Sequence, residues 1–263
     1  MEAVTGVFGS RSDAEHAMRE IRSTGVSEKE VTLLTPERLE QAAQSVPVDA
    51  GEQPGMGKAI GAVLGGSAGL SGGALIIAAM VPGVGPITAV GLLGGLILGA
   101  AGASIGAAAG EKLDNSVTEG LPEDELFVYE DVLRKGRSVV VVLAKDETAA
   151  SGFRDLLAAE GAESVDAARE QWWIGLRGAE QERYSKFGRT FGEDEKFYRM
   201  GFESALHART RCREYDQVLA EMTAQSEELQ RQHPDARVAE AFQRGYERGR
   251  DYYQQLCNQS KAA

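Results

Sequence analysis

Residues 57–73 read GKAIGAVLGGSAGLSGG, and residues 91–107 read GLLGGLILGAAGASIGA. Both stretches repeat a small residue at every fourth position, and apart from Gly57 and Lys58 they belong to a run of 52 residues, 59–110, without a charged side chain. On a helix, a four-residue repeat brings the small residues onto one face, where a second helix can approach at backbone distance. The pattern predicts a hairpin of two helices, over 59–81 and 86–109, within residues 57–112.

The predicted contact between these helices is made by glycines that recur along each stretch. They are Gly57, Gly61, Gly65, Gly69, Gly73, Gly91, Gly95, Gly99, Gly102 and Gly106. A turn separates the helices, since proline and glycine disfavour helix interiors. Its residues are Pro82, Gly83, Gly85 and Pro86. We expect the glycines to join helix to helix within one chain and between copies, so that the protein forms a homo-oligomer.

The composition of the hairpin suits two environments. Each helix would be about 35 Å long at 1.5 Å per residue, enough for the roughly 30 Å hydrocarbon core of a bilayer. We therefore expect insertion into a lipid bilayer, with both termini in the cytoplasm. However, no aromatic residue between Phe8 and Phe127 marks a membrane interface. The alternative is a soluble cytoplasmic homo-oligomer whose hairpins form an internal apolar core, because a soluble monomer would expose too much apolar surface.

The sequence on either side of the hairpin predicts a small α+β domain. Strands are expected at residues 2–8, 31–34, 138–144 and 163–166, and the valine run in the third indicates burial on both faces. Helices are expected from Ser10 or Ser12 to Arg22, at 122–135 and at 147–159. Without the hairpin and the helix that follows it, this order is βαββαβ, a split ferredoxin-like plait. Residues 36–56, polar and rich in turn formers, are interpreted as a linker.

Short motifs in both halves of this domain follow the pattern of a known family. The first half contains Val4-Thr5-Gly6-Val7-Phe8, Ala14-Glu15-His16-Ala17 and Ile21-Arg22-Ser23-Thr24-Gly25. The second contains Gly120-Leu121-Pro122-Glu123-Asp124, Tyr129-Glu130, Leu133-Arg134-Lys135-Gly136 and the strand from Val139 to Leu143. Residues 1–35 and 116–168 thus resemble the heat-induced general stress protein domain of the YflT type, in which glycine-zipper insertions are common. The resemblance implies a plait linked to the stress response and no catalytic residue.

The region 170–263 holds 13 of the 17 aromatic residues and is expected to be mostly helical. Tyr198-Arg199-Met200-Gly201-Phe202-Glu203 and Phe242-Gln243-Arg244-Gly245-Tyr246-Glu247 form a weak internal repeat, each with a glycine beside two aromatics. One helix is predicted over 193–232, with a break at His233-Pro234 and a second helix to residue 257. Trp172 and Trp173 are interpreted as core residues or as a membrane-interface anchor.

Charge and motif content argue against several classes of function. The net charge is −12, and residues 1–170 hold 13 Lys and Arg against 25 Asp and Glu, which argues against nucleic-acid binding. The two cysteines, Cys212 and Cys257, form no metal or disulfide pattern with each other, as in a reducing cytosol. The G-x-S-x-G match at Gly65–Gly69 lacks the preceding strand that a hydrolase needs. We expect no cofactor, no metal, no small-molecule substrate and no enzymatic activity. The sequence thus predicts a self-assembling, membrane-associated stress-response protein.

Overall fold

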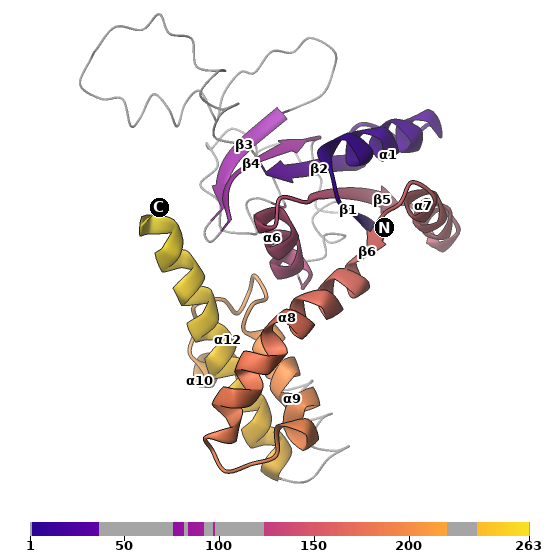
Figure 1. Ribbon diagram of the computed structural model, residues 1–263. Helices are drawn as coiled ribbons and strands as arrows, with labels where there is room; N and C mark the ends of the chain where they lie inside the picture. The colour runs from indigo at the N-terminus through magenta and orange to yellow at the C-terminus, as the bar shows by residue number, and fades with distance from the viewer. Residues whose placement is uncertain are drawn as a thin grey trace, which may run out of the picture. The chain divides into compact units, whose positions relative to one another are not determined.

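The computed structural model describes residues 2–36, 76–81, 84–91, 97, 124–219 and 236–262 (Figure 1). These residues form an α+β structure, with an antiparallel sheet, interleaved helices and a helical C-terminal region. The chain divides into two compact units. Unit 1 comprises Met1–Pro122 and Val128–Arg169, and unit 2 comprises Glu123–Phe127 and Glu170–Ala263.

Unit 1 is built on an antiparallel sheet of five longer strands and one of two residues. The strands are β1 (Glu2–Phe8), β2 (Val31–Pro36), β3 (Ile76–Val81), β4 (Gly85–Val90), β5 (Ser138–Ala144) and β6 (Glu163–Ser164). Their order across the sheet is β3-β4-β2-β5-β1-β6. β5 lies between β1 and β2, and all of its residues are buried, which confirms the expectation from its valine run.

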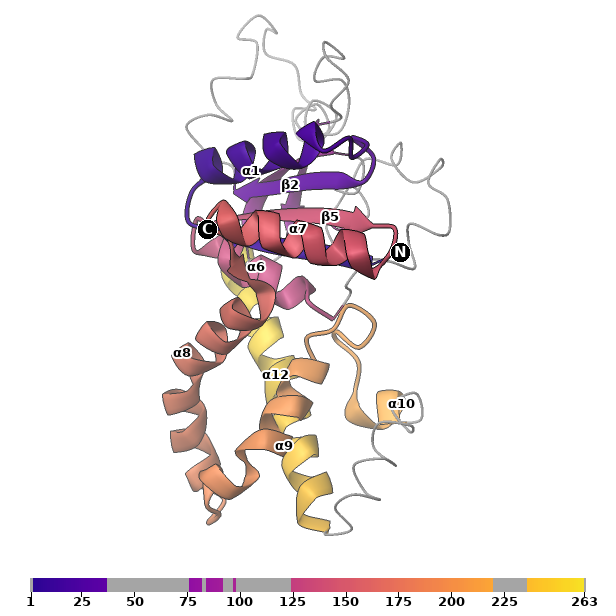
Figure 2. The ribbon, with the colours of Figure 1, turned by 90° about the vertical axis from the view of Figure 1, so that its right-hand side faces the viewer.

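Helices of unit 1 cover both faces of the sheet. α1 (Arg11–Ser23) and α7 (Glu147–Ala159) pack on one face, as Figure 2 shows. The core between them and the strands includes Val4, Phe8, Ala17, Ile21, Leu33, Val140, Val142 and Leu157. α6 (Leu126–Arg134) lies on the other face, where the hydroxyls of Tyr129 and Thr5 are 2.8 Å apart. The predicted helix over 122–135 is therefore confirmed with a later start.

Side-chain caps explain where α1 and α7 begin. The Ser10 hydroxyl accepts a hydrogen bond from the backbone N–H of Asp13 at 3.2 Å. The Asp146 carboxylate accepts one from the N–H of Ala149 at 2.9 Å. Each cap satisfies a backbone donor that has no partner within its helix. Ser10 is thus the N-cap of α1, and the predicted bounds of α7 are confirmed.

The charge-free run departs from its predicted structure. Residues 76–81 and 85–90 form the strands β3 and β4, so the helices predicted over 59–81 and 86–109 are wrong in these two segments. β4 pairs with β2 from Leu33↔Val90 to Pro36↔Ile87. β-branched residues are dense in both strands and favour the pleated conformation, and β2 offers its backbone groups to β4. Gly91, which directly follows β4, and Ile97, which is helical and buried, are also described. The rest of both predicted helices lies outside the described residues, as does the predicted linker beyond Pro36.

Unit 2 is helical among its described residues. Its helices are α8 (Val165–Ser185, which begins in unit 1), α9 (Phe191–Ser204), α10 (Tyr215–Leu219) and α12 (Ala236–Ala262). The single helix predicted over 193–232 is wrong, because α9 ends at Ser204. The Thr210 hydroxyl donates to the Ser204 carbonyl, and Arg211 Nε donates to the Leu206 carbonyl at 2.7 Å, so side chains bind the carbonyls that end the helix. The predicted His233-Pro234 break lies outside the described residues.

Candidate functional site

Most of the predicted helix-packing glycines fall outside the described part of the chain. Those positions are Gly57, Gly61, Gly65, Gly69, Gly73, Gly95, Gly99, Gly102 and Gly106, together with Pro82 and Gly83 of the predicted turn. Gly85, Pro86 and Gly91 are described, and all three lie in or beside β4. Their predicted place in or between helices is therefore wrong.

Gly91 and Gly85 each have a backbone conformation that favours glycine. Gly91 follows β4 with φ +125°, and a Cβ there would overlap the carbonyl oxygen of Val31. Gly85 opens β4 with φ +106°, next to a turn in which the Val84 N–H donates to the Val81 carbonyl at 3.1 Å. The predicted chain reversal near Pro82–Pro86 thus exists, but it joins two strands. Gly91 allows the end of β4 to approach β2 closely, whereas the four-residue glycine repeat predicted close approach between two helices.

Trp172 and Trp173 lie in the core of unit 2. Their side chains are 3% and 1% exposed, so neither is free to anchor the chain at a membrane interface. Trp172 packs against Phe127 at 4.9 Å between ring centroids, and both tryptophans meet Phe202 at 5.8 Å. The tryptophans therefore belong to an aromatic layer between α8 and α9.

The internal repeat forms a close contact between two helices of unit 2, the crossing of α9 and α12 (Figure 2). A Cβ on Gly201 would overlap the Phe242 carbonyl and approach the Tyr246 N–H. A Cβ on Gly245 would in turn overlap the Tyr198 carbonyl and approach the Phe202 N–H. The two halves of the repeat thus occupy equivalent positions about a local twofold axis, and each glycine admits the other helix.

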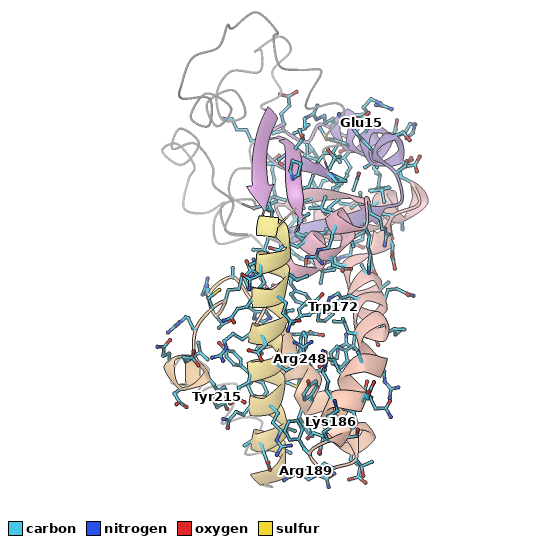
Figure 3. All side chains as sticks on the ribbon, turned by 60° about the vertical axis from the view of Figure 1, so that its left-hand side comes forward. Glu15, Trp172, Lys186, Arg189, Tyr215 and Arg248 are labelled. Carbon is cyan, nitrogen blue, oxygen red and sulfur yellow. The ribbon has the colours of Figure 1, made fainter. Side chains whose placement is uncertain are left out.

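Three carboxylates of unit 2 share one pattern of binding, with an aromatic donor and an arginine on each. Glu180 of α8 accepts from Tyr198 Oη at 2.8 Å and from Nη2 of Arg248, which is labelled in Figure 3, at 2.9 Å. Asp194 of α9 accepts from Tyr184 Oη and Arg237 Nε, both at 2.8 Å. Each of these two carboxylates therefore connects three helices, α8, α9 and α12.

The third carboxylate, Glu195, binds two neighbours on α8. It accepts from Trp173 Nε1 at 2.9 Å and from Arg177 through two hydrogen bonds of 2.7 Å. A bidentate arginine fixes both position and orientation of a carboxylate. Arg199 adds a further link, because its guanidinium lies 5.5 Å from the Trp173 ring centre and 2.6 Å from Glu170. We call Glu180, Asp194, Glu195 and their partners the carboxylate cluster.

Burial and the surrounding charges change the acidity of this layer. Burial raises the pKa of Tyr184 to about 12, and its hydrogen bond to Asp194 acts in the same direction. Burial also raises the pKa of Tyr198 well above its usual range, with a contribution from Glu180. The hydrogen bond from Arg177 lowers the pKa of Glu195, and the bond from Trp173 adds to the effect. The tyrosines are thus held as neutral donors at neutral pH.

The chemistry of the carboxylate cluster is structural. Glu180 and Asp194 are 1% and 2% exposed, and both accept hydrogen bonds from donors on neighbouring helices. A general base must instead reach a substrate proton. Within the described ranges, no group of three or more His, Cys, Asp or Glu side chains is arranged to hold a metal ion. The cluster fixes how α8, α9 and α12 meet.

The sequence predicted membrane-spanning helices, and it gave no indication of the carboxylate cluster. No helix in the described part of the chain combines the length and the apolar composition that a bilayer crossing requires.

The carboxylate cluster was missed, because its members are separated by up to 68 positions, as between Glu180 and Arg248. The aromatic-glycine repeat was the signal that the sequence carried for this region. In the structure it lies at the crossing of α9 and α12, and it gave no indication of the buried charges.

No family model matches this sequence, and searches of curated proteins and of solved structures give no match either.

Proposed function

We propose that this protein is a non-enzymatic scaffold of the stress-response type that assembles with copies of itself. In this proposal, unit 1 carries the charge-free segment that drives assembly, and unit 2 is a rigid helical module. The resemblance of residues 1–35 and 116–168 to the YflT-type stress domain supports the link to stress. The order β2-β5-β1-β6 supports a split ferredoxin-like plait, since β5 lies between β1 and β2 while α1 connects those two strands.

One observation carries the assembly proposal, the register between β3 and β4. Ile76 and Val90 are directly opposite each other in this hairpin. The residues that precede β3 and those that follow β4 therefore enter and leave the sheet at the same point. Both flanks, 59–75 and 91–110, are free of charge and rich in glycine. We propose that they bury one another, and those of other copies, in a shared apolar core.

The same sheet argues against the bilayer-spanning form of the hairpin. β2, β3 and β4 are hydrogen-bonded neighbours, so the connection from β2 to β3 begins and ends on one side of any bilayer. A single crossing between β2 and β3 would put them on opposite sides. We therefore favour the homo-oligomeric scaffold over a spanning hairpin. Association with one face of a membrane stays a prediction.

Cell fractionation tests this choice. We expect the untagged full-length chain to appear, without detergent, in the soluble fraction of broken cells, as a particle that sizing shows to be larger than one chain. Gly65→Leu and Gly95→Leu should reduce the particle size, because a large side chain blocks close approach. Gly152→Leu is the matched control, since Gly152 lies on α7 with open space around it.

Two results would contradict the proposal. A protein that stays in the carbonate-washed membranes and needs detergent would favour the inserted hairpin. A metabolite that raises the melting temperature of the purified chain in an unbiased screen would revive the alternative of an enzyme, because ligands that bind the native state stabilise it.

A further inference from the structure

The sheet of unit 1 has two edges that differ in how they are protected. At one edge, β6 has only two residues, and its Glu163 accepts a hydrogen bond from Arg137 at 2.6 Å. The neighbouring strand β1 begins at Glu2, which forms an ion pair with Arg154. Short strands and charged side chains keep a sheet edge from pairing with a further strand. At the other edge lies β3, which has six residues (Figure 1).

β3 lacks the features that protect the first edge. Among the strands that the structure describes, β3 is paired with β4 alone, from Ile76↔Val90 to Val81↔Gly85. Its six residues include no charged residue and no proline, which are the residues by which natural edge strands avoid further pairing. The backbone of β3 is therefore suited to accept a second strand.

Pro86 indicates which backbone groups of β3 face outward. Proline has no N–H, so the Met80–Pro86 pair cannot exchange two hydrogen bonds. Bonded and non-bonded pairs alternate along an antiparallel ladder. The pairs that bond β3 to β4 are therefore those at the odd-numbered positions of β3. The residues whose N–H and C=O groups point away from β4, toward the open edge, are Ile76, Ala78 and Met80.

We propose that the open edge of β3 pairs with the same edge of a second copy, as two antiparallel strands. A twofold axis at Ala78 sets Ala78 opposite Ala78 of the second copy, and Ile76 opposite Met80. Each outward-facing residue then meets another, so the donors at this edge find acceptors. A symmetric contact of this kind joins two copies. The proposal rests on the proposed self-assembly and adds a contact that is separate from the glycine-rich flanks.

Composition favours a second copy over another segment of the same chain. An open backbone edge accepts an extended strand. Six of the 17 residues 59–75 and seven of the 20 residues 91–110 are glycine, which is depleted in strands. Residues 37–58, 111–123 and 220–235 contain charged side chains, which suit an uncharged edge poorly. A second copy instead supplies β3 itself, a strand already formed in its own sheet.

Charge also permits two copies to meet at this edge. The net charge of the chain is −12, so copies repel where acidic surfaces meet. The four strands nearest the open edge, β3, β4, β2 and β5, contain no charged residue. The charged residues within the strands of this sheet, Glu2 and Glu163, lie toward the opposite edge. The pairing therefore brings together the uncharged strands of each sheet.

Mass measurements on the purified full-length chain test the proposal. In detergent-free buffer, Gly65→Leu with Gly95→Leu should reduce the particle to dimers, twice the 28.1 kDa of one chain. Adding Ala78→Pro should convert those dimers to monomers, because proline removes the N–H at the centre of the pair and leaves the bonds between β3 and β4 in place. Adding Ala78→Thr instead should leave dimers, since threonine keeps the N–H and favours a strand.

Hydrogen exchange identifies what occupies the edge. In the double glycine variant, the outward amides of Ile76, Ala78 and Met80 should exchange slowly in the dimer and rapidly after dilution to monomers. The amides of Ile77 and Ala79, which face β4, should exchange slowly at both concentrations. Slow exchange of the outward amides at every concentration would place a segment of the same chain at this edge and would overturn the proposal.

The outcomes separate the edge contact from assembly through the flanks. Dimers that persist with Ala78→Pro, or monomers already in the double glycine variant, would overturn the edge contact and leave the role of the flanks standing. If the glycine substitutions change nothing but Ala78→Pro lowers the mass, the edge contact stands and the role of the flanks fails. A wild-type monomer would overturn both. Slow exchange at Ile77 and Ala79 in the Ala78→Pro variant excludes loss of β3 as the cause.

Discussion

Glycine has a different neighbour in each unit of this protein. In unit 1, Gly91 follows a strand and lies against the backbone of Val31. In unit 2, Gly201 on α9 lies against the backbone of α12, and Gly245 on α12 lies against the backbone of α9. In both places glycine permits a close approach of two backbones that any side chain would prevent. The difference lies in the neighbours, which are β-branched residues in unit 1 and aromatic residues in unit 2.

This contrast shows what a repeated glycine predicts. The spacing indicates that backbones approach closely, and it leaves the type of element open. Ile76, Ile77 and Val90 favour strands around the turn in unit 1. In unit 2, aromatics one and three positions from each glycine fill the layer around a helix crossing. The following predictions test this contrast between the units.

Gly245→Ala should have the largest effect. The added Cβ would overlap the Tyr198 carbonyl, so α9 and α12 must separate. We expect a loss of about 3 kcal/mol in the free energy of unfolding of unit 2. Tryptophan fluorescence during urea unfolding measures it, because both tryptophans of the chain lie in unit 2. Gly192→Ala, on α9 with open space around it, should be harmless, and equal stability of the two variants would contradict the crossing.

Glu180→Gln should have a similar or slightly smaller effect. The substitution leaves Arg248 without a carboxylate at a position that is 15% exposed. Removing one partner of a buried ion pair costs about 3 kcal/mol. The same fluorescence transition measures the loss. Glu182→Gln, an exposed residue of the same helix, should change stability by less than about 0.5 kcal/mol, and a comparable loss there would argue against the carboxylate cluster.

Gly91→Ala tests the close approach of β4 to β2 in unit 1. Alanine is strained at φ +125°, and its Cβ would overlap the Val31 carbonyl, so we expect a loss of about 2 kcal/mol. Hydrogen exchange of the β2 and β4 amides should accelerate, while tryptophan fluorescence of unit 2 stays unchanged. Gly152→Ala on α7 is the control, because alanine favours a helix interior. Unchanged exchange would mean that β4 does not pair with β2.

High pH should weaken unit 2. The pKa of Tyr184 is raised to about 12, and in the unfolded chain it is near 10. Its contribution to stability is therefore complete below pH 10 and is lost as the pH rises toward 12. Tyr246, whose pKa burial also raises to about 12, acts in the same direction. Tyrosinate absorbance and tryptophan fluorescence should change together, and full titration of every tyrosine near pH 10 without unfolding would contradict this.

Local signals predicted much of unit 1. The valine run of β5 and the Ser10 cap of α1 act over a few residues, so the sequence displays them directly. The β3–β4 hairpin depends on pairing with β2, which is a partner distant in the sequence. Period-four glycines over a charge-free run fit a helix locally, and only the available edge of β2 selects the strand.

The carboxylate cluster could not be predicted for a related reason. Each of its carboxylates, such as Asp194, has sequence neighbours typical of an exposed helix, and its partners come from other helices. The aromatic-glycine repeat could be read, because both halves carry the same residues at the same spacing. The sequence thus predicted two helices that carry this repeat, whereas the crossing of α9 and α12 at its glycines and the charges buried around it came from the structure.

The most direct test of the central claim is the mass of the purified full-length chain in detergent-free buffer, measured by sedimentation equilibrium. Assembly through uncharged flanks that meet at the Ile76–Val90 pair predicts a particle of several chains, a multiple of 28.1 kDa. A single species of 28.1 kDa across the concentration range would contradict self-assembly.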